Sequence, residues 1–215
     1  MAFHPHLEIL PRAQARLWSE LSALPGQFVL YGGTALALHL GHRNSVDFDF
    51  FARESLNLPQ LEGEIPFLAG ANITQREKNT LSAIVERGEP VKVSFFGVPK
   101  LPQLEPVHVV EENNLKVASL LDLAGTKASV IQVRAEAKDY LDLDAIMRLG
   151  GVDLATALGA ARALYGPTFN PQVTLKALSY FDDGNLYDLP NDLKLRLVEA
   201  AREVDLDDLP LVEAS

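Results

Sequence analysis

The chain has 215 residues, of which 47% are hydrophobic, and its formal net charge is −10. This size and composition suit one large domain or two small ones with a real core, and the acidity argues against a protein that coats nucleic acid electrostatically. A nucleic-acid substrate would need a local basic patch, to which Arg134, Lys138 and Arg148 could contribute. The sequence contains no cysteine, which excludes a disulfide framework and a thiolate metal site. It shows neither a signal peptide nor an apolar run near the ~20 residues that span a bilayer, so we expect a soluble, cytoplasmic protein with no membrane partner.

The first elements lead to a pair of glycines. Residues 7–24 carry apolar side chains at helical spacing and predict a helix that ends at residues 25–26. The apolar residues 28–31 predict a buried strand, which runs into Gly32 and Gly33. These glycines let the backbone turn tightly and let another group approach closely. Residues 35–40 predict a short helix, with Thr34 as its N-cap and Gly41 at its C-terminal end.

Apolar and acidic residues then alternate from Val46 to Phe50. This period of two places Asp47 and Asp49 on one face of a strand, with Val46, Phe48 and Phe50 on the other. Two carboxylates ~7 Å apart on one strand can share a divalent cation, and Mg²⁺ prefers oxygen ligands. The N-terminus of the preceding helix offers free N–H groups to a phosphate. The alternative is an amphipathic edge strand whose aspartates are merely solvated.

The rest of the chain predicts four more strands, followed by helices. Residues 72–77, 80–87 and 91–96 predict an antiparallel meander, and residues 107–110 an edge strand. Helices are predicted from a capping box at Ser119 and Asp122, at residues 135–149, from Asp153 to residue 164, and at residues 170–181 and 190–204. We therefore expect an α+β fold: residues 1–112 form a small mixed or antiparallel sheet flanked by helices, and residues 113–215 form a helical bundle packed on it.

A second group of charged residues lies in the helical half. Read as helix, Lys127 and Arg134 share one face, as do Asp139 and Asp142. The alternative is a pair of surface helices with routine ion pairs, such as Lys138 with Asp142, each worth only a few tenths of a kcal/mol.

Together these motifs resemble a known family. The first motif consists of Gly32-Gly33-Thr34 and Asp47-x-Asp49, and the residues from Thr34 to Val46 number thirteen. It resembles the signature of the polymerase-β-type nucleotidyltransferases. With Arg43 and Ser45 before the acidic pair, the form is most similar to the AbiEii/AbiGii toxin family of bacterial abortive-infection systems. The segment around Lys127 and Asp139 is similar to a second motif of that family.

The resemblance implies an activity and partners. It implies a Mg²⁺-dependent enzyme that moves a nucleoside monophosphate from a nucleoside triphosphate to a hydroxyl acceptor, either RNA such as a tRNA or a protein. It also implies that the chain is a toxin with an antitoxin protein as partner.

The resemblance also implies roles for residues on both motifs. Asp47 and Asp49 would hold Mg²⁺, and Asp139 would assist at the acceptor hydroxyl. The remaining residues would bind the nucleotide's phosphates or orient Asp47: Gly32, Gly33, Thr34, Arg43, Ser45 and Lys127.

One position departs from the superfamily pattern. These enzymes usually supply a third carboxylate from a later strand, and the matching position here is Ser94, with Lys92 on the same face. The departure leaves open a nucleotide-binding module of the same fold that has lost turnover. A nucleotidyltransferase acting on a small molecule, like the aminoglycoside enzymes, is the other alternative, because an acidic surface suits a cationic acceptor.

Overall fold

A computed structural model describes residues 3–213 of the chain, which divides into two compact units. The first unit comprises Met1–Leu101 and Val107–Ala118, and the second comprises Pro102–Pro106 and Ser119–Ser215. In the described part of the chain, no helix combines the length and the apolar character that crossing a membrane requires.

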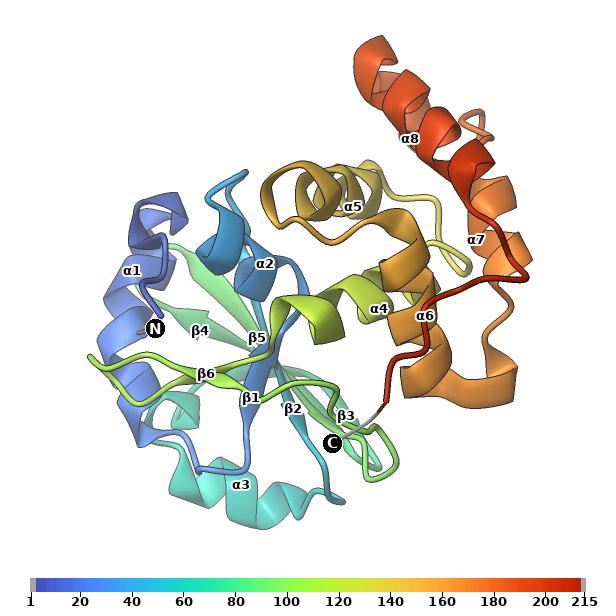
Figure 1. Cartoon of the computed structure of the whole chain (residues 1–215). Helices are drawn as coiled ribbons and strands as arrows, with labels where there is room; N and C mark the ends of the chain where they lie inside the picture. The colour runs from blue at the N-terminus through green and yellow to red at the C-terminus, as the bar shows by residue number, and fades with distance from the viewer. Residues whose placement is uncertain (1–2, 214–215) are drawn as a thin grey trace. The chain divides into compact units, whose positions relative to one another are not determined.

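One mixed sheet forms the centre of the first unit (Figure 1). Among residues 3–213 it has seven strands in the order β3-β4-β5-β2-β1-β7-β6. The pairs β2–β5 and β1–β7 are parallel, and the other neighbours are antiparallel. The strands are β1 (Val29–Tyr31), β2 (Asp47–Ala52), β3 (Asn72–Glu77), β4 (Thr80–Glu86), β5 (Pro90–Gly97), β6 (His108–Val109) and β7 (Lys116–Val117).

The strand predictions are confirmed with one addition. The meander of β3, β4 and β5 and the edge position of β6 agree with the sequence patterns. Strand β7 was not predicted, because two residues between loops carry no periodicity. Its parallel pairing with β1 extends the sheet on that side.

The predicted continuous helix over residues 7–24 is wrong. Pro11 takes an extended ψ of 153° and divides the segment into a 3₁₀ turn and α1. The helices of this unit are η1 (Leu7–Ile9), α1 (Arg12–Trp18), η2 (Ser19–Ala23), α2 (Gly32–Leu40), α3 (Leu58–Glu64) and η3 (Pro66–Leu68).

Strand β2 gives the sheet one apolar and one polar face. Phe48 and Phe50 are fully buried, and the Phe50 ring lies 5.5 Å from that of Phe95 on β5. Asp47 and Asp49, on the opposite face, are only half-buried. The predicted separation of apolar and acidic residues is therefore confirmed for these positions. Val46, also predicted on the apolar face, lies before β2 and is 63% exposed.

Gln14 on α1 is buried without a hydrogen-bond partner. Its side chain is 2% exposed, and neither amide atom has a partner in the described part of the chain. Because an unpaired buried amide costs about 1–3 kcal/mol, we expect Gln14→Met to raise Tm by about 2–4 °C per kcal/mol recovered.

Thermal unfolding of the full chain measures this effect. Gln132→Met is the matched control and should lower Tm, since the Gln132 amide donates to Asn170 O and Thr174 Oγ1, both at 2.8 Å. A lower Tm for Gln14→Met would show that the Gln14 amide is satisfied in solution.

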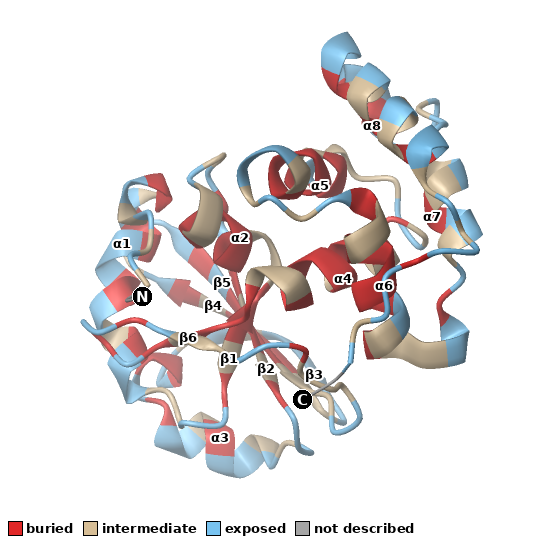
Figure 2. Cartoon of the chain, in the orientation of Figure 1, coloured by how far each residue is buried: buried red, intermediate tan, exposed pale blue. Residues whose placement is uncertain are grey.

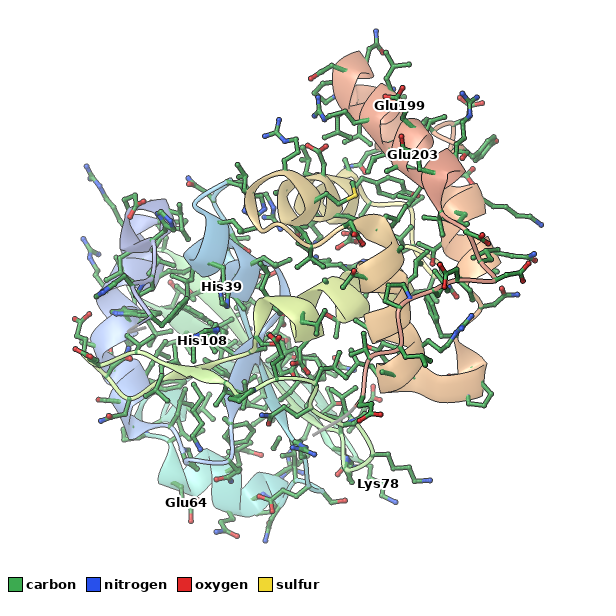
Figure 3. All side chains as sticks on the ribbon, viewed as in Figure 1. His39, Glu64, Lys78, His108, Glu199 and Glu203 are labelled. Atoms are coloured by element: carbon green, nitrogen blue, oxygen red, sulfur yellow. The ribbon has the colours of Figure 1, made fainter. Side chains whose placement is uncertain are left out.

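His39 and His108 lie together at one side of this unit (Figure 3), with ring centroids 5.1 Å apart. The His39 Nε2–H donates to Ala118 O at 2.8 Å. Burial lowers the pKa of His39 to about 4, against the smaller raising effect of that hydrogen bond.

The lowered His39 pKa predicts a pH-dependent stability. Between about pH 6.5 and pH 4 the unfolded chain binds a proton at this position that the folded chain does not. The contribution of neutral His39 to the free energy of unfolding is therefore fully present above about pH 6.5. It should fall by about 3 kcal/mol as the pH drops to 4. Urea unfolding across this range should show that slope in wild type and in His4→Gln. The slope should be absent in His39→Gln, whose amide can keep the bond to Ala118.

The second unit is helical. Its helices are α4 (Leu120–Val130), α5 (Ala137–Leu149), α6 (Leu154–Tyr165), η4 (Gly166–Thr168), α7 (Pro171–Ala177), η5 (Leu186–Asp188) and α8 (Asn191–Glu203). Helix α4 packs against α5 and α6, and Figure 2 shows buried residues along all three. The predicted caps at Ser119 and Asp153 are confirmed, because their side chains accept N–H bonds from residues of the first turn. Helix α7 ends four residues earlier than predicted.

Asp122 holds a separate piece of chain onto α4. Its carboxylate accepts the Leu104 and Glu105 N–H groups, both at 3.1 Å, and the Ser119 hydroxyl at 2.5 Å. The Asp122 side chain is buried and makes every one of these bonds within the second unit. Of the predicted capping box, the bond from the Asp122 N–H to Ser119 Oγ forms, but the Asp122 carboxylate accepts the Ser119 hydroxyl and anchors residues 102–106.

Candidate active site

Asp47 and Asp49 begin β2 on the polar face of the sheet. In the β1–β2 pairing, Asp49 lies opposite Tyr31, the last residue before the glycine pair. The register therefore brings the end of β1 and the start of β2 together. Both side chains are half-buried and on the same side of the strand, where a cation could contact both.

Gly32 allows the close approach of Asp49. Helix α2 begins at Gly32, whose φ is +74°, and a Cβ there would lie 2.7 Å from Asp49 Oδ2. A side chain at this position would be strained and would also displace the carboxylate. The first N–H groups of α2 thus lie beside the acidic pair.

Thr34 is not the N-cap of α2, which corrects the prediction. The helix begins three residues earlier than predicted, after Tyr31, and no side chain caps it. Thr34 instead lies in the first turn, is 1% exposed, and its hydroxyl donates to the backbone carbonyl of Asp47. This bond ties the start of α2 to the start of β2.

Gly33, Arg43 and Ser45 come together, although ten residues separate Gly33 from Arg43. A Cβ at Gly33 would lie 2.5 Å from Arg43 Nη2 and 3.1 Å from Ser45 Oγ. The guanidinium therefore lies against the first turn of α2, where N–H groups have no partner within the helix. Helix N–H groups beside an arginine are the chemistry that binds phosphate.

Strand β5 carries no carboxylate beside the acidic pair. Its parallel register places Ser94 next to Asp49 and Lys92 next to Asp47. Ser94 is 1% exposed, and its hydroxyl is bonded to that of Ser82 at 3.1 Å. Lys92 is exposed and has no ion-pair partner among residues 3–213. The sequence predicted Lys92 on the same face as Ser94 but suggested no function for it.

The donor set of this face fits a substrate-bound Mg²⁺. Within the described residues, no group of three or more His, Cys, Asp or Glu side chains could hold a metal by itself. Mg²⁺ commonly uses one or two protein carboxylates and completes its shell with substrate phosphates and water. Asp47 and Asp49 supply those carboxylates.

The second group of charged residues forms a buried ion cluster in the second unit. Lys127 Nζ on α4 lies 2.7 Å from Asp139 Oδ1 and 2.6 Å from Asp142 Oδ2 on α5. Arg134 contacts both oxygens of Asp139, at 2.7 and 3.0 Å. Both carboxylates are inaccessible to solvent, and the lysine side chain is 7% exposed.

The cations of this cluster determine the acidity of Asp139. Burial by itself raises the pKa of the Asp139 carboxyl. The hydrogen bonds from Arg134 and the charge and hydrogen bond of Lys127 outweigh burial and hold that pKa below its ordinary value. Asp139 is thus an anion at neutral pH and a weak base.

The three residues considered for a basic patch are each paired with a carboxylate. Arg134 contacts Asp139, Lys138 contacts Glu136 at 2.9 Å, and Arg148 contacts Asp144 at 3.4 Å. The Lys138–Asp142 pair of the alternative interpretation does not form, since Asp142 contacts Lys127 instead.

Comparison with known protein families shows to which family the chain belongs. The model of the family described as "Nucleotidyl transferase AbiEii toxin, Type IV TA system" matches residues 16–210. The chain belongs to the AbiEii family. An uncharacterised protein from Aquifex aeolicus (strain VF5) is 32% identical over 158 residues, which cover 73% of this chain and 74% of that protein.

Solved structures share the fold of this AbiEii family member. A protein from H. pylori, described as a candidate nucleotidyltransferase, superposes with a TM-score of 0.55 at 20% identity, covering 88% of this chain and 92% of its own. MenT4, a nucleotidyltransferase toxin from Mycobacterium tuberculosis H37Rv, gives a TM-score of 0.52 at 16% identity, covering 91% and 83%. The predicted family is therefore confirmed, and the chain is a toxin-type nucleotidyltransferase.

Two cavities of the first unit lie away from the acidic pair. One, of about 210 Å³, is lined by residues of η2 and of the loop before β7, including Leu21 and Asn113. The other, of about 200 Å³, lies between residues 67–72 and the end of β4. Neither includes a residue predicted for the site.

Proposed function

We propose that the chain transfers a nucleoside monophosphate from a nucleoside triphosphate, with Mg²⁺, to a hydroxyl acceptor. The observation that supports it most is the packing of Asp49 against Gly32, which puts a pair of carboxylates beside free helix N–H groups. The carboxylates suit a divalent cation, and the helix N–H groups suit a phosphate. A triphosphate that carries its own Mg²⁺ needs both.

The roles of the residues in the first unit follow from charge. Asp47 and Asp49 would hold the metal against the α-phosphate, and the start of α2 with Arg43 would bind the β- and γ-phosphates. When bound, Mg²⁺ supplies neutralisation of the charge on the phosphates. The acceptor hydroxyl oxygen bonds to the α-phosphorus, the bond to the bridging oxygen breaks, pyrophosphate leaves, and the hydroxyl proton is released. Lys92, next to Asp47, adds a positive charge on this face.

Lys127 and Asp139 keep the roles implied by the family, with one refinement. Lys127 would contribute charge to phosphate binding and Asp139 would act at the acceptor hydroxyl once the ion cluster that buries both side chains opens. Because the pKa of Asp139 lies below its ordinary value, a role in orienting the hydroxyl suits it better than proton abstraction.

The acceptor would be an RNA end or a protein hydroxyl, and an antitoxin protein would be the partner. A second candidate acceptor is a small cationic molecule. It is favoured by the net charge of −10 and by the pairing of Arg134, Lys138 and Arg148 with carboxylates.

A transfer assay tests the proposal. The full chain is incubated with Mg²⁺ and each α-labelled triphosphate, together with total RNA, cell protein or small polycationic polyols. We expect Mg²⁺-dependent labelling of one acceptor class and release of pyrophosphate. Calorimetric binding of triphosphate without transfer would instead identify a binding module, and the absence of both would refute the proposal.

A further inference from the structure

Three aromatic rings lie beside the acidic pair on the same face of the sheet. Tyr31, Phe51 and Phe96, which we term the aromatic row, come from β1, β2 and β5. Strand register places Tyr31 next to Asp49 and Phe51 next to Phe96. The Tyr31 and Phe51 ring centroids are 4.9 Å apart, and those of Phe51 and Phe96 are 5.0 Å apart. The rings thus form one continuous apolar strip that starts beside Asp49.

Two of the three rings of the aromatic row keep accessible surface, whereas Tyr31 is only 7% exposed. Phe51 and Phe96 are half-buried, whereas Phe48, Phe50 and Phe95 on the other face are fully buried. The phenylalanines of the other face are part of the hydrophobic core. Phe51 and Phe96 are only half-buried and lie on the face of the two aspartates, so packing in the core does not account for them.

We propose that the aromatic row stacks the base of the nucleoside triphosphate. This inference rests on the proposed function, which places the α-phosphate at Asp47 and Asp49. Phe51 follows Asp49 by two residues on the same face, hence ~7 Å along the strand, a separation that one ribose can bridge. The phosphate-binding start of α2 lies at the Asp47 end of this line, so phosphates, sugar and base would follow β2 in order.

The chemistry of the row suits a base and none of the triphosphate's charged parts. Stacking on aromatic rings strengthens nucleic-acid binding by about 5- to 150-fold per base and tolerates every base, since each has a π-face. The phenylalanines offer no hydrogen bond to a base edge, so all four triphosphates should gain from the row.

Binding measurements with and without a base test this inference. The full chain, its Phe51→Leu and Phe96→Leu variants, and Phe51→Tyr as the conservative variant are titrated calorimetrically with Mg²⁺ and each triphosphate. Inorganic tripolyphosphate with Mg²⁺ is the ligand that lacks a base. We expect each leucine variant to bind the nucleotides about tenfold more weakly. Tripolyphosphate affinity should not change, and Phe51→Tyr should bind like wild type.

Phe181→Leu is the matched control, since Phe181 is a half-buried phenylalanine of the second unit, and it should leave both affinities unchanged. Unchanged nucleotide affinity in both leucine variants, or an equal loss for tripolyphosphate, would overturn the stacking inference while leaving the proposed function standing. A wild-type chain that binds neither ligand would overturn both.

Discussion

Asp47→Asn should reduce nucleotidyl transfer by about a thousandfold, the size of effect seen when a main electrostatic contact of an active site is removed. Asparagine keeps the shape of aspartate but loses the charge that holds a divalent cation. The fold should survive, because the bond that Thr34 makes here is to the backbone carbonyl of Asp47 and does not involve its carboxylate. The same α-labelled triphosphate assay measures the loss, and growth inhibition by the expressed chain should disappear with it.

Asp182→Asn is the matched control, since Asp182 is an exposed aspartate of the second unit. It should transfer nucleotide like wild type, and both variants should unfold at the wild-type temperature. If Asp47→Asn kept activity within about tenfold of wild type, Asp47 would have no metal-holding role.

Lys127→Met should lower the free energy of unfolding by about 3–5 kcal/mol, because it leaves the carboxylates of Asp139 and Asp142 buried with less compensation. Arg134 still contacts Asp139 in this variant. Far-UV ellipticity follows the helices in a urea titration. Trp18, the single tryptophan of the chain, reports separately on the first unit.

Lys138→Met is the matched control for the buried lysine. Lys138 contacts only Glu136 among the ion pairs of the described residues, and both side chains are more than 40% exposed. Its loss should cost at most about 1 kcal/mol. Equal effects of the two substitutions would show that the buried cluster contributes no more than a surface pair.

Local periodicity predicted the parts of the site that depend on one element. Alternation along residues 46–50 was enough to put Asp47 and Asp49 on one face, and Gly41, with φ +61°, ends α2 as a C-cap glycine should. The caps at Ser119 and Asp153 followed from similar short-range chemistry.

Local sequence patterns could not predict contacts between different helices and strands. Thr34 has good N-cap chemistry, but Gly32 starts the helix earlier and the hydroxyl bonds to β2 instead. The approach of Lys127 to Asp142 depends on how α4 packs on α5, so the pairing Lys138–Asp142, natural on a single helix, was the wrong one. Roles for individual site residues remain predictions that the variants above test.

The anchoring of residues 102–106 by Asp122 has a consequence for dissecting the protein. Since that segment belongs to the second unit, the chain crosses from one unit to the other after residues 101, 106 and 118. No single cut separates the two units: a fragment starting at residue 119 would lack the N–H groups of Leu104 and Glu105 that Asp122 binds. A helical fragment that keeps these bonds would therefore begin at residue 102, with a linker in place of residues 107–118 joining residues 102–106 to residue 119.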